Sequence, residues 1–306
     1  MKFAWTVVAT LMLASSAAAQ SRPSVLFIGN SFTYAHGSPV MSYRPDTVTD
    51  LNATGIGGVP ALFKSFSRQA GMDYDVFLET HGGAGLDYHL LKKLDAIGSR
   101  GWDMVVMHGY STLDHDKPRD PAKLVATSKD MADFLRRHNP KVDLYLMATW
   151  SRADQTYPRT GAWAGEPIEA MARDVRAAYD KAAESAAAKA VIPVGEAWTR
   201  AIRAGVADPN PYDGVEPGKL DLWAGDHYHA SAYGSYLEAL VVFGSLTGRD
   251  PRSLGENECS AHELGIDRRQ VKALEQVAFD ELAKAGAVTP NPLVLPKPAD
   301  PVPCVH

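Results

Sequence analysis

Residues 24–33 read SVLFIGNSFT, and this stretch decides the fold. The apolar run Ser24 to Ile28 predicts a buried strand, and Gly29 and Asn30 begin the turn that leaves it. A serine on such a turn presents its hydroxyl at the edge of the sheet, where a base can reach it. Ser31 is therefore a candidate nucleophile, although a lone serine in this position is more often a turn residue or a helix cap.

The matching base is expected near the other end of the chain. Asp226-His227-Tyr228-His229 precedes a helical pattern from Ala230 to Gly248. Asp226 lies three residues before His229, so a short turn can bring its carboxylate to one imidazole nitrogen while the other nitrogen faces a serine. The alternative is an N-terminal helix cap beside a surface histidine. The predicted catalytic order along the chain is Ser, Asp, His.

Short apolar runs alternate with helical patterns along the whole chain. The five predicted strands are Val25 to Ile28, Asp75 to Leu78, Met104 to Met107, Leu144 to Met147 and Val191 to Val194. The helical patterns between and after them are Val59 to Ala70, Leu86 to Ile97, Pro121 to Arg137, Pro167 to Lys189 and Glu196 to Ala204. This rhythm predicts an α/β fold, a flavodoxin-like three-layer α/β/α sandwich around a central five-stranded parallel sheet.

Ligands of such sheets bind at the carboxyl ends of the strands, so the residues that follow each run predict the pocket. Five side chains near these ends are candidate pocket-lining residues: Tyr34, His36, Tyr110, Trp150 and Glu196. The long segment between residues 34 and 58 is either a lid or binding loop, or a surface insertion.

The first residues predict an export signal. Lys2 precedes the apolar run Phe3 to Leu13, and small residues at 17–19 form a cleavage site. The apolar run is too short to span a bilayer, and no membrane span is expected elsewhere. We therefore expect a signal peptide at 1–19, one domain at 20–286, a proline-rich tail at 287–306, and a periplasmic or secreted location.

Charge and cysteine content narrow the classes of partner. A net charge of -5 without a basic run leaves no electrostatic footprint for nucleic acid. Cys259 and Cys304 could form a disulfide in an oxidising compartment, and the alternative is two thiols. Two cysteines without clustered histidines do not make a zinc site, and no cofactor is expected.

These motifs resemble those of the SGNH hydrolase superfamily, also called GDSL-like esterases and lipases. Gly29-Asn30-Ser31 resembles the first block, with Asn30 where many members have aspartate, and Phe32-Thr33 continues it as in a bacterial branch that reads GNSFT. Asp226-x-x-His229 resembles the last block. The resemblance covers almost the whole mature domain and implies the SGNH hydrolase fold.

The resemblance also implies an oxyanion hole. The N–H groups of Ser31 and of Gly83 would bind the oxyanion, with Gly82 as the alternative to Gly83. Most members place an asparagine after the third strand as a side-chain donor, and the bacterial branch uses glutamine. This chain has His108 there, and a histidine can donate one hydrogen bond.

The function that the resemblance implies is that of an exported serine esterase acting on small acyl esters, such as acetyl groups on a carbohydrate. Two alternatives stay open. One is an inactive carbohydrate-binding protein of the same fold, with sugars stacked on aromatic residues: Tyr110, Trp150, Tyr157, Trp163 and Trp223. The other is a metal-dependent hydrolase that uses His and Asp side chains: His81, His89, His108, Asp114, His115, Asp116, His227 and His229. No HExxH spacing supports the second.

Overall fold

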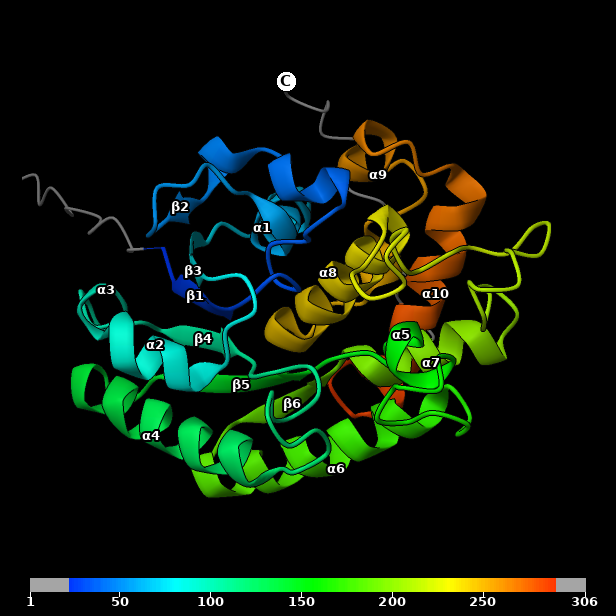
Figure 1. The fold of residues 1–306 in the computed structure, drawn as a ribbon. Helices are drawn as coiled ribbons and strands as arrows, with labels where there is room; N and C mark the ends of the chain where they lie inside the picture. Colours follow the sequence, from blue (N-terminus) through cyan, green and yellow to red (C-terminus); the bar gives the residue numbers. More distant parts are fainter. Residues whose placement is uncertain (1–21, 290–306) are drawn as a thin grey trace, which may run out of the picture.

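A computed structural model of the protein describes residues 22–289 and has three layers, with helices on both faces of one sheet (Figure 1). Every strand pairing in the sheet is parallel, and the strand order is β2-β3-β1-β4-β5-β6. The strands are β1 (Ser24–Gly29), β2 (Thr49–Asp50), β3 (Asp75–Thr80), β4 (Met104–Met107), β5 (Asp143–Ala148) and β6 (Ala190–Pro193). The predicted α/β sandwich is confirmed, and its five predicted strands all form.

The two faces of the sheet bury separate apolar cores because side chains alternate along each strand. In β1, Val25 and Phe27 pack on one side, whereas Leu26 and Ile28 pack on the other. The first core lies against α1 (Gly58–Gln69), α7 (Val194–Arg203), α8 (Ala232–Thr247) and α10 (Arg268–Lys284). The second lies against α2 (Leu86–Lys92), α3 (Leu94–Ile97), α4 (Ala122–His138) and α6 (Glu169–Ala186).

Helix α8 positions half of the candidate site. It packs against α1, α7 and α10, and apolar residues surround it on all sides. Ser231 caps its first turn by accepting a hydrogen bond from the Gly234 N–H. The chain that enters α8 therefore arrives at a fixed angle, and His229 lies just before the cap.

The structure differs from the predicted elements in three places. The predicted helix 86–97 breaks at Lys93 into α2 and α3. Helix α10 was not predicted, and neither were the short helices α5 (Ala153–Thr156) and α9 (Cys259–Glu263). The sheet has six strands instead of five, because the two residues of β2 pair with β3. A two-residue strand is too short to show an alternating pattern in the sequence.

The segment at 34–58 is packed rather than free-standing. It contains the 3-10 helices η1 (Pro39–Ser42) and η2 (Pro45–Thr47) as well as β2, and it buries Val40 and Tyr43. The Leu51 N–H donates to the Leu78 carbonyl, which anchors the segment to the edge of the sheet. The segment is thus packed on the domain and extends the sheet, and its role as a lid or binding loop stays a prediction.

Some of the predictions concern residues beyond those described. The signal peptide falls within 1–21, and Cys304 with most of the proline-rich tail falls within 290–306, so the domain boundaries and the cysteine pairing stay predictions. Within 22–289, no helix combines the length and the apolar character needed to cross a membrane.

Candidate active site

Three side chains form a continuous hydrogen-bond chain at the carboxyl end of β1. The Ser31 Oγ lies 2.8 Å from His229 Nε2, and His229 Nδ1 lies 2.6 Å from an Asp226 oxygen. Ser31 and His229 are buried, whereas the Asp226 side chain is 47% exposed. The structure thus brings together the three residues of the predicted triad, although two of them lie about 200 residues from the first.

The local sequence explains how Asp226 reaches its histidine. One Asp226 oxygen accepts hydrogen bonds from the N–H groups of Tyr228 and His229, at 3.0 and 2.9 Å, which leaves the other oxygen for the imidazole. The turn is closed by His227, whose φ is +57°. Asp226 does not cap α8, because Ser231 does so. The helix-cap alternative for the Asp-x-x-His motif therefore does not hold.

The surroundings keep the imidazole neutral and the carboxylate charged. Burial is the largest influence on His229 and lowers its pKa, against the opposing effect of Asp226, and His36 and Arg152 lower it further. Burial alone would raise the pKa of Asp226, but the hydrogen bonds from His229 and from two backbone N–H groups outweigh it, so that pKa is lowered. The charged carboxylate accepts from Nδ1–H, which leaves the Nε2 lone pair facing the serine.

Asn30 joins the loops that follow three neighbouring strands. Its Nδ2 donates to the carbonyls of Ala84 and Gly109, at 2.8 and 3.3 Å, and its Oδ1 accepts from the Phe32 N–H at 3.1 Å. An aspartate carboxylate cannot donate to two carbonyls. The amide at this position therefore fits the loops of this chain better than the aspartate that many SGNH hydrolases have.

The backbone donors predicted for the oxyanion have no partner inside the described part of the protein. Across residues 22–289, no hydrogen bond uses the N–H of Ser31, Gly82 or Gly83. Gly83 has φ of +71°, a conformation that favours glycine, and a Cβ on Gly82 would lie 2.8 Å from the Tyr34 hydroxyl. Both glycines stay candidates for the second donor.

His108 does not fit the predicted role of side-chain oxyanion donor. Its Nδ1 lies 3.1 Å from the Gly109 carbonyl, which only accepts, so Nδ1 carries the proton. Burial lowers the His108 pKa to about 4, so the ring is neutral and Nε2 accepts from the Thr33 hydroxyl at 2.8 Å. A nitrogen that accepts cannot donate to an oxyanion. His108 instead holds the turn after Ser31 to the end of β4.

Trp150 lies in the core rather than on a binding surface. Its ring stacks between those of Phe32 and Trp198, with centroids 4.0 and 4.6 Å away, and is fully buried. Trp163 and Trp223 are buried as well. Three of the five aromatic residues proposed as sugar platforms are thus inaccessible, because they pack into the two apolar cores.

Tyr34 and His36 lie beside the triad, as predicted for pocket-lining residues. The rings of His36 and His229 are 4.8 Å apart, and those of Tyr34 and His36 are 6.0 Å apart. Tyr110 is partly exposed, and its hydroxyl donates to Asp87 over 3.4 Å.

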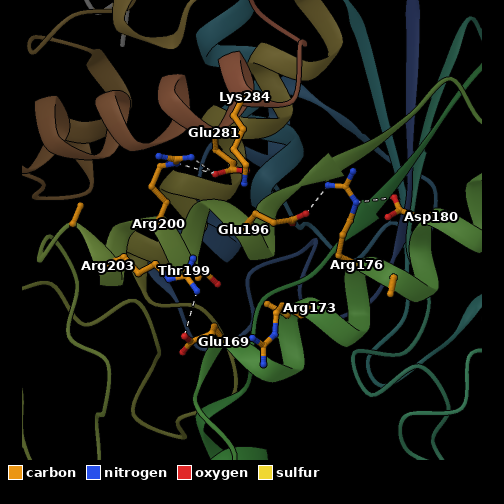
Figure 2. Close-up of a pocket in the computed structure, with 13 residues that line it drawn as sticks. Glu169, Arg173, Arg176, Asp180, Glu196, Thr199, Arg200, Arg203, Glu281 and Lys284 are labelled. Carbon is orange, nitrogen blue, oxygen red and sulfur yellow. Dashed lines mark hydrogen bonds and ion pairs between the residues drawn. The ribbon is translucent and has the colours of Figure 1, made fainter.

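Glu196 lies away from the predicted pocket. It lies in the first turn of α7 and pairs with Arg176 of α6, in a charged groove of about 620 Å³ between α6, α7 and α10 (Figure 2). None of the three triad residues lines this groove. The carboxyl end of β6 leads directly into α7, which carries Glu196 away from the serine.

Sequence reasoning missed Arg152. Its guanidinium lies 3.5 Å from the centroid of the Tyr228 ring, and that ring stacks on His229 with centroids 4.0 Å apart. Asp154 binds the guanidinium through both carboxylate oxygens. The sequence did contain a signal for Arg152, because this residue lies shortly after β5 and ligands of parallel sheets bind at the carboxyl ends of the strands.

The histidines that suggested a metal site are dispersed. His81 stacks on Tyr88, His115 lies beside Tyr110, and His227 lies beside Tyr212. Within the part of the chain that the structure describes, no three His, Cys, Asp or Glu side chains are grouped so that they could hold a metal ion.

Comparisons with known proteins support the fold. No protein-family model and no curated protein matches the chain. A DUF4886 family protein from Bacteroides uniformis is similar in structure, with a TM-score of 0.59, 18% identity, and coverage of 88% of this chain and 98% of that one. A candidate SGNH hydrolase from Slackia heliotrinireducens has a TM-score of 0.50 and 20% identity, covering 74% of this chain and 100% of that one.

A candidate GDSL-like lipase from Parabacteroides merdae is similar too, with a TM-score of 0.52, 14% identity, and coverage of 72% of this chain and 94% of that one. At such identities the likeness shows the fold alone. The chain has the SGNH hydrolase fold, as its motifs predict, and the GNSFT branch stays a prediction.

Proposed function

We propose that this protein is a serine esterase that hydrolyses small acyl esters, with Ser31 as nucleophile, His229 as general base and Asp226 as the group that orients the imidazole. The observation that carries the proposal is the unbroken hydrogen-bond chain from the Ser31 hydroxyl through His229 to Asp226. A neutral imidazole between a hydroxyl and a carboxylate is the arrangement that activates a serine.

The reaction follows from this geometry. His229 Nε2 removes the hydroxyl proton as Ser31 Oγ attacks the ester carbonyl carbon, and the carbonyl oxygen becomes an oxyanion. The unpaired N–H groups of Ser31 and of Gly83 or Gly82 are the donors available to bind it within the described residues. His229 then protonates the leaving alkoxide oxygen as its bond to the carbonyl carbon breaks, which leaves the acyl group on Ser31. Water attacks this acyl-enzyme while His229 takes a proton from it, and that proton returns to Ser31 Oγ as the carboxylic acid leaves.

The acyl group that we propose is small, with acetyl on a carbohydrate as the first substrate class to try. Two supports come from the sequence, which are the predicted export signal and the SGNH resemblance. The third is that segment 34–58 is packed on the domain, so this segment does not form the long apolar lid that a lipase needs. Tyr34, His36 and Tyr228 supply polar and aromatic groups beside the triad. We also propose that the protein acts in the periplasm or outside the cell.

Hydrolysis of p-nitrophenyl acetate tests the proposal, with Ser31→Ala and His229→Ala beside the wild type. We expect the loss of either group to lower kcat by about 10⁶-fold, as for triads that act as a unit. A serine-directed fluorophosphonate should label the wild type at Ser31 only. Equal turnover in all three proteins would exclude the triad. An unlabelled, inactive wild type that binds acylated glycans would favour the carbohydrate-binding alternative.

A further inference from the structure

A second histidine–carboxylate pair lies beneath the nucleophile turn. Glu79 is near the end of β3 and His89 is on α2, and both side chains are fully buried. His89 Nδ1 forms a hydrogen bond with Glu79 Oε2, and His89 Nε2 lies 3.0 Å from the carbonyl oxygen of Gly29. Gly29 ends β1 and stands two residues before Ser31.

The partners of the pair determine where its protons lie. A carbonyl oxygen only accepts, so His89 Nε2 carries a proton. Glu79 Oε1 accepts from Asn52 Nδ2 at 3.0 Å, and Lys93 Nζ is 3.8 Å from the same oxygen. Burial alone would raise the Glu79 pKa, but His89, Asn52 and Lys93 together lower it. Glu79 therefore holds the ring at Nδ1, while the Nε2–H points at the Gly29 carbonyl.

The Gly29 carbonyl is the point where three parts of the site meet. Besides His89, it accepts a hydrogen bond from the His81 N–H at 3.1 Å. His81 begins the loop that contains Gly82 and Gly83. A single carbonyl oxygen therefore fixes the end of the nucleophile strand relative to the loop of the second oxyanion donor.

We propose that Glu79 and His89 are positioning residues, in which the buried imidazole held by Glu79 anchors the Gly29 carbonyl and so sets Ser31 against the backbone donors of the oxyanion. This inference rests on the proposed esterase function and extends it to residues that do not touch the substrate. A misplacement of about 1 Å in such a site can lower the rate by about 10²-fold.

Segment 34–58 supplies a further hydrogen bond to the pair of Glu79 and His89. Asn52 follows β2 and donates to both Glu79 Oε1 and the Thr80 carbonyl, each at 3.0 Å. Its own oxygen accepts from Lys93 Nζ at 2.6 Å. The turn after β2 thus carries the Asn52 side chain, which shields the carboxylate of Glu79 from water. The amide of Asn52 takes the place of that water as hydrogen-bond donor.

Glu79→Gln tests the proposal without changing the shape of the core. The amide that this change introduces bonds to His89 Nδ1 without the charge of the carboxylate, which weakens the hold on the ring that anchors Gly29 through Nε2. We expect kcat for p-nitrophenyl acetate to fall by about 10- to 100-fold with KM little changed. Glu275→Gln is the matched control, since Glu275 is a buried carboxyl on α10 outside the site, and we expect wild-type kcat.

A spectroscopic measurement separates positioning from simple packing. In ¹⁵N-labelled wild type, His89 Nε2 should carry a proton that is hydrogen-bonded to the Gly29 carbonyl, because a carbonyl oxygen only accepts. His89→Gln is the second variant; its amide can still donate to Gly29, so it should keep more activity than His89→Ala.

Failure of the esterase proposal and failure of the positioning proposal give different results. A wild type that neither hydrolyses the ester nor reacts with a fluorophosphonate overturns the esterase function, and the positioning role with it. An active wild type whose His89 Nε2 carries no proton, or a Glu79→Gln variant with wild-type kcat, overturns the positioning role alone.

Discussion

Two histidine–carboxylate pairs lie on either side of the same turn, and they differ in what the second imidazole nitrogen meets. His229 Nε2 faces the hydroxyl of Ser31, which can give up a proton, whereas His89 Nε2 faces the carbonyl of Gly29, which has none to give. The carboxylate of the first pair is half exposed, and that of the second is fully buried. One pair is therefore suited to move a proton and the other to hold the backbone.

His108 extends the comparison to a third case. Like His229, it places Nε2 against a hydroxyl, that of Thr33, but its Nδ1 bonds to a carbonyl instead of a carboxylate. With no carboxylate to stabilise an imidazolium, burial outweighs the Gly109 carbonyl and lowers the His108 pKa to about 4, which makes the ring a poor base. The carboxylate, and not the hydroxyl contact alone, distinguishes the candidate base.

The largest effect in this comparison is expected from Asp226→Asn. An amide cannot stabilise the imidazolium and can hold the imidazole in the wrong tautomer, and in a triad this change lowers kcat by about 10⁴-fold. The equivalent change in the buried pair, Glu79→Gln, should lower kcat far less. Steady-state kinetics on both variants checks the difference, with circular dichroism as the control for folding. Similar losses in the two variants would contradict the division of roles.

The second largest effect is expected in the pH dependence of activity, which should follow the Asp226–His229 pair. Only neutral His229 can accept the serine proton, so kcat/KM should rise with pH through the His229 pKa and then level off. Because that pKa is lowered from 6.5, the midpoint should fall below 6.5. A profile of kcat/KM for p-nitrophenyl acetate measures it. A midpoint well above neutrality would mean that burial does not control this histidine.

Much of this site could be predicted because it depends on local sequence. Ser31 follows a strand with a clear apolar pattern, and Asp226 and His229 are three residues apart on one turn. The pairing of Glu79 with His89 joins a strand to a helix, and its meaning depends on Gly29 from a third element. No spacing in the sequence indicates such a contact.

The sequence also does not indicate in which direction the side chains at the strand ends point. Trp150 and Glu196 follow β5 and the end of β6 as predicted, yet one turns into an aromatic stack and the other toward Arg176. Helix α10 was predictable, since Asp267 and Gln270 form a capping box and apolar residues share one face behind it. It lies beyond the alternation of strands and helices that indicates the sheet.

A smaller effect is expected on stability in acid. The Glu79 pKa is lowered in the folded protein, so its charged form stabilises the fold above the unfolded value, near 4.5, and this contribution is lost as the pH falls through the folded pKa. The free energy of unfolding of wild type should therefore approach that of Glu79→Gln below pH 4.5. Urea titrations from about pH 3 to about pH 7, the range in which carboxyl groups titrate, measure the difference. A difference that does not vary with pH would show that folding leaves the Glu79 pKa unchanged.

Thr33→Val should have the smallest effect on activity and separates His108 from the other two histidines. The change keeps the side-chain shape and removes the hydroxyl that His108 Nε2 accepts from, so a buried acceptor loses its partner at a cost of about 1–3 kcal/mol in the free energy of unfolding. Turnover should stay within a few-fold of wild type, because neither group touches the ester. Losing an oxyanion donor costs about 10²–10³-fold in kcat, so a loss of that size with unchanged stability would return His108 to the oxyanion hole. Denaturant unfolding and kinetics on the same sample therefore decide whether this imidazole supports the turn or the transition state.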